Sequence, residues 1–292
     1  MSCGLGRYTC GKVTIFVALT ASLAGCMTPT PIESEFRTAP MYLGYDATVP
    51  NVPFAVDSSY RYVGSKSLAD AKKQNDNGLL VAWSRYLVNH AGADTSHTVL
   101  KELRLTEVAF LTASHVPLIP IYMPAQQILK GSEASGAAAA TEAENLIDAI
   151  ASPSHEQKII MIFLDVEGTQ PVSNDFLLGW CKGLRDYQSH HVQFQPAIYT
   201  NAGPLGQSTR LAINAIRPQC QIKGLWYARY VATKALPTAW PDFNESLKHE
   251  VEAVPDVPVY LWQYYEDAKK QMDFNLINPT LTQELVARSL TR

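Results

Sequence analysis

The sequence predicts an α/β fold, a closed (β/α)8-like (TIM) barrel, over residues 40–292. Strand-like apolar runs alternate with helix-like segments from residue 40 onward, and repeated βα units indicate a parallel sheet. The run KIIMIFLDVE at 158–167 is continuously apolar, as in a parallel strand covered on both faces. No repeat, linker or change of composition divides this stretch, which favours one barrel. A doubly wound sheet is the alternative, but no Gly-rich phosphate loop follows the first strand.

The individual elements follow from apolar patterning. Strands are expected at 41–46, 79–86, 117–122, 158–167, 193–200, 223–230 and 257–264, with a short one at 272–274. Helices are expected at 101–114, 131–151, 174–189 and 204–216. The second of these helices is rich in Ala and Glu, which have high helix propensity.

Composition excludes several classes of protein. The chain has 292 residues, of which 47% are hydrophobic and 10% aromatic, so it is not a disordered chain. A net charge of -3 gives no basic surface for nucleic acid. The seven histidines show no metal-binding spacing, and we expect no metal and no cofactor.

The N-terminus has the features of an export signal. Arg7 and Lys12 precede an almost wholly apolar run, 13–24, which is too short to span a bilayer. The run ends in LAGC at 23–26, which resembles a bacterial lipobox. The resemblance implies a signal peptide at 1–25, lipidation of Cys26 and a tether at 26–39. A buried N-terminal helix, or an ordinary signal peptide with a chance cysteine, are the alternatives.

The lipobox also predicts a location. Met27 follows the lipidated cysteine, which by lipoprotein sorting rules predicts an outer-membrane anchor facing the periplasm. Cleavage and lipidation leave Cys181 and Cys220 as the remaining cysteines, and a disulfide or two buried thiols are equally compatible with the sequence.

Acidic residues end several of the predicted strands. They are Asp46, the pair Asp165 and Glu167, and Asp273. The C-terminal strand ends of a β/α barrel form its active site. Asp165 and Glu167 are two residues apart, so their side chains point the same way. Two like charges in partial burial raise the pKa of one, as glycosidases require of their general acid. Alternatively, such acids only cap the following helices.

Four strings carry a resemblance to a known family. They are FLDVEG (163–168), AIYTNAG (197–203), LWYARY (225–230) and WQYYEDAKKQMDFN (262–275). In this order they resemble glycoside hydrolase family 25, the lysozyme-like muramidases. The N-terminal half, with GYDATVP in place of the usual G-x-D-V-S, is closer to neighbouring glycoside-hydrolase-like domains of unknown activity. The resemblance covers nearly all of 40–280.

The resemblance implies roles for individual residues. Glu167 would be the general acid, flanked by Asp165 and Asp46, which would orient the N-acetyl group or stabilise the oxocarbenium charge. Asp273 matches the acid of the family's closing motif. Tyr199, Trp226 and Trp262 are expected to stack on sugar or to contact the acetamido group, with ordinary barrel core as the alternative for each. Arg229 would pair with a catalytic acid, or with a lactyl or peptide carboxylate of the substrate. Tyr122 and Gln263 are further candidates for substrate contacts.

These expectations lead to two alternative functions. The first is a cell-envelope lipoprotein hydrolase of peptidoglycan glycan strands, held to the membrane by its lipid. The second is a non-catalytic glycan-binding or structural envelope lipoprotein on the same barrel, since one barrel fold hosts many functions.

Overall fold

The structure is a computed structural model, and it describes residues 52–58, 63–74, 78–89, 103–150, 158–167, 171–187, 192–231, 237, 239–242, 254–267 and 272–290. The predicted signal peptide, Cys26 and Asp46 lie outside these residues. All described residues belong to one compact unit, 39–292. No helix in this part of the chain is long and apolar enough to cross a membrane.

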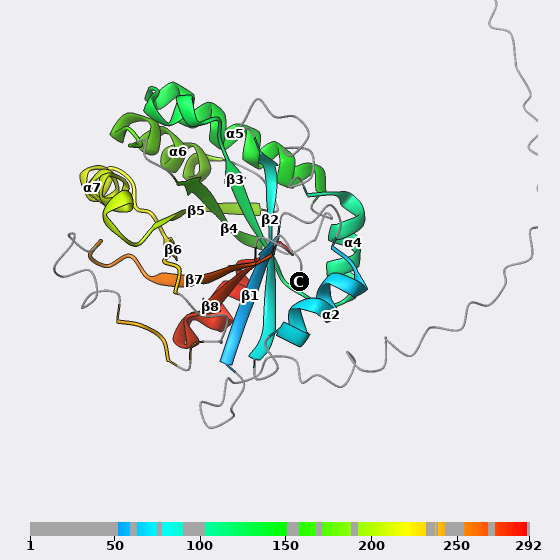
Figure 1. The fold of residues 1–292 in the computed structure, drawn as a ribbon. Coiled ribbons are helices and arrows are strands. Elements are labelled where there is room, and N and C mark those ends of the chain that lie inside the picture. The colour runs from blue at the N-terminus through cyan, green and yellow to red at the C-terminus, as the bar shows by residue number, and fades with distance from the viewer. Residues whose placement is uncertain are drawn as a thin grey trace, which may run out of the picture. The chain divides into compact units, whose positions relative to one another are not determined.

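Eight strands form a closed barrel in the order β1 to β8, which confirms the predicted fold class (Figure 1). The strands are β1 (Val52–Ser58), β2 (Gly78–Asn89), β3 (Leu118–Met123), β4 (Lys158–Val166), β5 (Val192–Asn201), β6 (Gly224–Ala228), β7 (Val259–Asp267) and β8 (Met272–Ile277). Neighbours from β1 to β7 pair in parallel. Strand β8 is antiparallel to both β7 and β1, so the barrel closes through its last strand.

The first strand differs from the sequence prediction. We expected it at 41–46 with Asp46 at its end, whereas the first barrel strand is β1, and the acid near its end is Asp57. The string VPFAVDS is a short apolar run ending in an acid, as GYD is, and it has more apolar residues to bury. The backbone of Asp57 is in register with Ser84 of β2 and Asp273 of β8.

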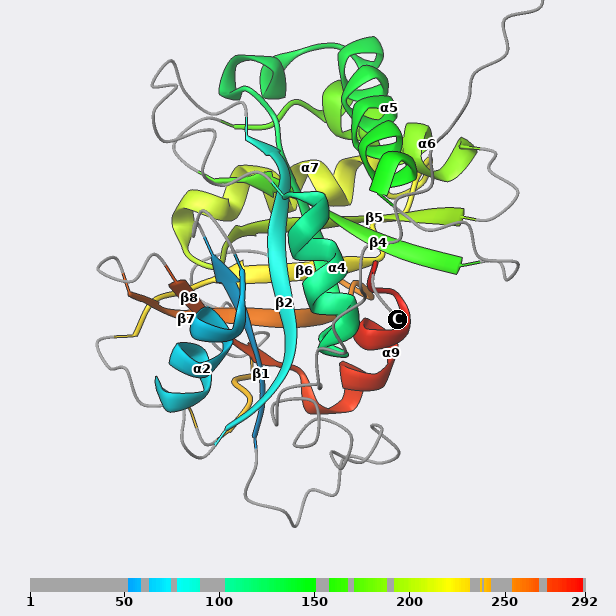
Figure 2. The ribbon, with the colours of Figure 1, turned by 90° about the vertical axis from the view of Figure 1, so that its right-hand side faces the viewer.

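Helices cover the outside of the barrel (Figures 1 and 2). The α-helices are α2 (Ser65–Gln74), α4 (Leu105–Ala113), α5 (Glu133–Ile150), α6 (Asn174–Asp186), α7 (Gln207–Ile216) and α9 (Thr282–Ala287). Short 3-10 turns are η1 (Gln126–Lys130), η2 (Pro204–Gly206) and η3 (Pro279–Leu281). The first five helices each follow one of the first five strands, as in the βα units that the sequence predicts.

Helices α5 and α6 lie side by side, and glycines allow their close approach (Figure 2). A Cβ on Gly136 would lie 1.9 Å from Phe176 O, and one on Gly179 would lie 1.9 Å from Glu133 O. Real Cβ atoms do not approach a carbonyl oxygen so closely. The two backbones therefore pack at a distance that only glycine permits at these positions.

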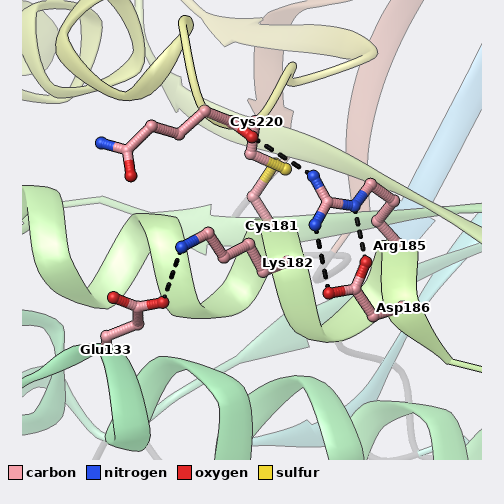
Figure 3. A network of polar contacts seen from close by, with 7 residues as sticks. Glu133, Cys181, Lys182, Arg185, Asp186 and Cys220 are labelled. Atoms are coloured by element: carbon pink, nitrogen blue, oxygen red, sulfur yellow. Dashed lines mark hydrogen bonds and ion pairs between the residues drawn. A yellow bond between two sulfur atoms is a disulfide. The ribbon is translucent and has the colours of Figure 1, made fainter.

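A disulfide ties α6 to the segment that precedes β6 (Figure 3). It joins Cys181 to Cys220, whose Cα atoms are 6.1 Å apart, and both residues are buried. Of the two alternatives that the sequence left open, the structure therefore has the disulfide. Lys182 Nζ reaches Glu133 Oε1 of α5 at 2.9 Å, and Arg185 Nη1 donates to Gln219 O at 3.2 Å, so α6 is bound on both sides.

The C-terminal segment covers the end of the barrel where the parallel strands begin. Leu290 N donates to Leu118 O at 2.7 Å, at the start of β3. Met161 N of β4 donates to Arg288 O at 2.9 Å, and Lys158 Nζ donates to Leu290 O. The end of the chain is thereby bound to strands from the middle of the sequence.

Candidate active site

The candidate site lies at the C-terminal ends of the parallel strands. Because β8 runs the opposite way, its first residues, including Asp273, lie at this same end. Side chains in this barrel alternate between the lumen and the helix-covered outer face. The lumen holds one buried cluster, which includes Ile121, Met161, Phe163, Tyr199 and Trp226.

Strand β4 brings Asp165 and Glu167 to one side, as the sequence predicts. Met161 and Phe163 belong to the lumen cluster, and Asp165 and Glu167 continue this alternate row to the end of the strand. Asp165 is fully buried, whereas Glu167 is half-buried. Two positions along a strand separate their Cα atoms by about 7 Å. The row therefore carries one acid in the lumen and one at its rim.

Tyr199 of β5 lies beside this pair. It is 2% exposed, and its hydroxyl donates to Gln263 Oε1 of β7. Burial raises the pKa of Tyr199 well above its ordinary value of 10. Smaller contributions in the same direction come from Glu167, Tyr86, Tyr230 and Asp165. Tyr199 is therefore a neutral phenol within electrostatic range of both acids.

Trp226 and Asn275 form the floor beneath the acids. Trp226 is 0% exposed, and its ring packs edge-on against Phe163 and Tyr199, with centroids 5.5 and 5.0 Å away. Its Nε1 donates to Asn275 Oδ1 at 2.8 Å, and Asn275 Nδ2 donates to Asp273 O at 3.3 Å. Trp226 is thus barrel core, which argues against the sugar contact expected for it, while Asn275 links the floor to the backbone of Asp273.

Two other predicted contacts lie on the outer face. Tyr122 of β3 is fully buried against α6, where its ring stacks on Trp180 with centroids 5.4 Å apart. Its hydroxyl donates to Glu142 of α5 at 2.5 Å. Trp262 packs with the outer cluster and is only 8% exposed. The alternation of their strands turns both rings away from the lumen, so these positions argue against substrate contacts.

Arg229 and Asp273 have different surroundings. Arg229 follows Leu225 and Tyr227, which belong to the outer cluster, so it continues the outward row of β6 and is exposed. Because this row faces away from the lumen, it argues against pairing of Arg229 with a catalytic acid. The alternative, pairing with a lactyl or peptide carboxylate of the substrate, stays a prediction. Asp273 is half-buried and shares its alternate row with Asn275 at the end of the barrel that holds the β4 acids.

Sequence reasoning missed some residues of the site. Tyr86 of β2 belongs to the lumen cluster and contributes to the raised pKa of Tyr199. Thr200 is fully buried, and its hydroxyl donates to Val166 O at 3.0 Å, on the peptide unit that leads into Glu167. No sequence signal identifies Thr200 by itself, because its alignment with Val166 depends on the register between β4 and β5.

No cluster of three or more His, Cys, Asp and Glu that could hold a metal is found in the described part of the chain. The site described above presents two closely spaced carboxyl groups, of Asp165 and Glu167, beside the neutral phenol of Tyr199. Such a pair can donate a proton from one group and stabilise positive charge with the other.

Comparison with protein-family models gives no match, and neither does comparison with curated proteins. Solved structures do match. An uncharacterized B. stearothermophilus protein is 19% identical with a TM-score of 0.59, over 81% of this chain and 99% of that one. A bacterial lysozyme from Streptomyces coelicolor is 13% identical with a TM-score of 0.47, over 82% and 97% of the two chains.

A glycosyl hydrolase 25 of Streptococcus pneumoniae is 14% identical with a TM-score of 0.48, over 82% of this chain and 94% of that one. At such identities a structural likeness bears on the fold alone. The first match, which spans almost the whole of the other chain, shares the barrel described above. The chain is therefore a closed α/β barrel with an acidic pair at the C-terminal end of its fourth strand.

Proposed function

We propose that this protein is a glycoside hydrolase that cleaves β-1,4 bonds of peptidoglycan glycan strands, with Glu167 as general acid. The observation that carries the proposal is the row on β4, which has Asp165 buried in the lumen and Glu167 half-buried at its rim. A general acid must reach the glycosidic oxygen of a large polymer, which a residue at the rim can do. Asp165 would stabilise the oxocarbenium charge or orient the N-acetyl group.

The surroundings of the pair suit this role. The neutral phenol of Tyr199 can donate only one hydrogen bond, and Gln263 accepts it. The hydroxyl of Tyr199 therefore does not also donate to the carboxyl group of Asp165 or Glu167. The bond from Thr200 to Val166 O fixes the backbone that leads into Glu167. Asp273 of β8 lies at the same end of the barrel as Asp165 and Glu167, where it would flank the substrate.

We also propose that the protein is a lipoprotein anchored by Cys26 in the outer membrane. The disulfide between Cys181 and Cys220 supports export, because disulfides persist in oxidising compartments and are rare in the cytosol. Mass spectrometry of the protein extracted from membranes tests the anchor. We expect a triacylated N-terminus at Cys26 and its loss in Cys26→Ser.

Digestion of purified peptidoglycan tests the hydrolase. The chain from Met27 should release fragments with new N-acetylmuramic reducing ends, identified by mass spectrometry. Glu167→Gln should slow release roughly 10²–10⁴-fold, the usual contribution of a general acid. Glu133→Gln, which changes an exposed acid ion-paired with Lys182, is the matched control and should retain activity.

Two results would contradict the proposal. Full activity in Glu167→Gln removes this residue from the mechanism. Saturable binding of peptidoglycan without new reducing ends, in wild type and variants alike, identifies a glycan-binding module instead of an enzyme.

A further inference from the structure

We propose that Tyr230 is a sugar-stacking residue at the rim of the site, against which a pyranose ring of the substrate packs next to Glu167. This inference rests on the proposed function and deepens it. It assigns the recognition of the sugar to an aromatic ring that the sequence did not single out.

Tyr230 differs from the other aromatic residues at this end of the barrel in its exposure. It is 52% exposed, whereas Tyr86 and Trp262 are 8% exposed and Tyr199 is 2% exposed. Among the large hydrophobic side chains exposed in the described residues, Tyr230 alone is aromatic. A pyranose ring presents a face of C–H groups that packs on an aromatic plane, and such packing requires an accessible ring.

The alternation of β6 directs Tyr230 toward the lumen. Trp226 and Ala228 belong to the lumen cluster, while Leu225 and Tyr227 belong to the outer one. Tyr230 continues the row of Trp226 and Ala228, and Val231 beyond it packs against the outer cluster. Tyr230 therefore stands above the floor residue Trp226, at the end of an inward-facing row.

The backbone around Tyr230 is held on both sides. Arg229 N donates to Gln263 O at 3.0 Å, and Val231 N donates to Tyr264 O at 2.8 Å, which extends the pairing with β7 beyond the end of β6. Trp262 Nε1 also donates to Arg229 O at 2.8 Å. A ring on a backbone fixed in this way loses little conformational freedom when it binds a ligand.

Tyr230 lies at the same end of the barrel as the acids. It follows the C-terminal end of β6, as Glu167 follows the C-terminal end of the parallel strand β4. Both residues also act electrostatically on Tyr199. A sugar stacked on Tyr230 would therefore lie at the end of the barrel that holds the carboxyl pair. The ligand class that fits is a β-linked glycan of pyranose units with equatorial substituents, whose ring faces stay free to stack.

The test separates binding from turnover in Tyr230→Ala and Tyr230→Phe. Digestion of soluble glycan strands prepared from peptidoglycan gives KM and kcat, and Glu167→Gln carrying the same changes gives Kd without turnover. We expect Tyr230→Ala to raise KM and Kd by roughly 5- to 20-fold, in line with a loss of about 1–2 kcal/mol at a ring contact. Its kcat should stay within about twofold of wild type, and Tyr230→Phe should keep the affinity because the ring is kept.

Leu211→Ala is the matched control, since it shortens a 46% exposed side chain on the outside of α7 and should change nothing. An unchanged KM and Kd in Tyr230→Ala would overturn the inference, and so would a Tyr230→Phe variant as weak as Tyr230→Ala. Binding by Glu167→Gln that depends on Tyr230, with no cleavage by wild type, would support the inference and refute the hydrolase. Neither cleavage nor binding would refute both.

Discussion

Because the carboxyl group of Glu144 is buried, we expect the free energy of unfolding to fall as pH rises. This residue of α5 is 2% exposed, and its Oε1 has no hydrogen-bond partner among the described residues. Burial, followed by the charge of Asp148, raises the pKa of Glu144 to about 8. At the same corner of the molecule, Asp148 Oδ2 accepts a hydrogen bond from the hydroxyl of Tyr187; a carboxylate oxygen only accepts, so it has no proton to donate to Glu144.

The sign and size of the effect follow from linkage between folding and protonation. The folded-state pKa of about 8 lies above the ordinary value of 4.5, so between these values the folded protein binds more protons than the unfolded chain. The stabilisation is complete below pH 4.5 and is lost as pH rises through 8. A tenfold change in proton affinity corresponds to about 1.36 kcal/mol, so the rise in pKa from 4.5 to about 8 limits this loss to about 5 kcal/mol.

Urea unfolding of wild type and Glu144→Gln at pH 5, 6, 7 and 8 measures the effect. The amide is nearly isosteric and stays neutral, so the two proteins should differ little at pH 5, and the variant should be more stable by several kcal/mol at pH 8. Glu133→Gln, an exposed change on the same helix, should follow the wild-type profile. Parallel pH profiles for wild type and Glu144→Gln would refute the reasoning.

Three further predictions concern packing, the disulfide and the site. Gly179→Ala should lower the free energy of unfolding by about 3 kcal/mol in urea, because its Cβ would meet Glu133 O, whereas Gly203→Ala, with no atom within 4 Å of its Cβ, should be close to neutral. Serine in place of both Cys181 and Cys220 should cost about 3 kcal/mol in the same assay, and an unchanged midpoint would count against a stabilising bridge over 39 residues. Thr200→Val should lower kcat several-fold with little effect on KM, because Val166 O loses its hydroxyl donor and the backbone before Glu167 is held less firmly. A kcat equal to that of wild type would contradict this positioning role.

Most of the barrel could be predicted from the sequence because its strands are apolar runs between helices of clear pattern. The strand expected at 158–167 and the helix expected at 174–189 agree with β4 and α6 to within a few residues. The first strand could not be predicted in this way, since GYD and AVD both resemble a short strand ending in an acid. The pairing of 52–58 with both β2 and β8 identifies this segment as the first barrel strand.

The acidic pair was predictable for a local reason, and the sugar contacts were not. Two positions along one strand share a side whatever the rest of the fold does, so Asp165 and Glu167 needed no tertiary information. Tyr122 and Trp262 lie on strands buried on both faces, where an apolar run gives no sign of which face is the lumen. The exposure of Tyr230 likewise depends on where β6 ends relative to β7, which is a property of the assembled sheet.

Closure of the barrel by β8 has a consequence for folding. Strand β1 pairs with β8, and the starts of β3 and β4 bond to residues 288–290, so both the wall and one end of the barrel are completed by contacts between segments far apart in the sequence. The wall stays open between β7 and β1 until β8 pairs with both. Contacts between distant segments form more slowly than local ones, so we expect the pairing of β8 to be a late step in folding.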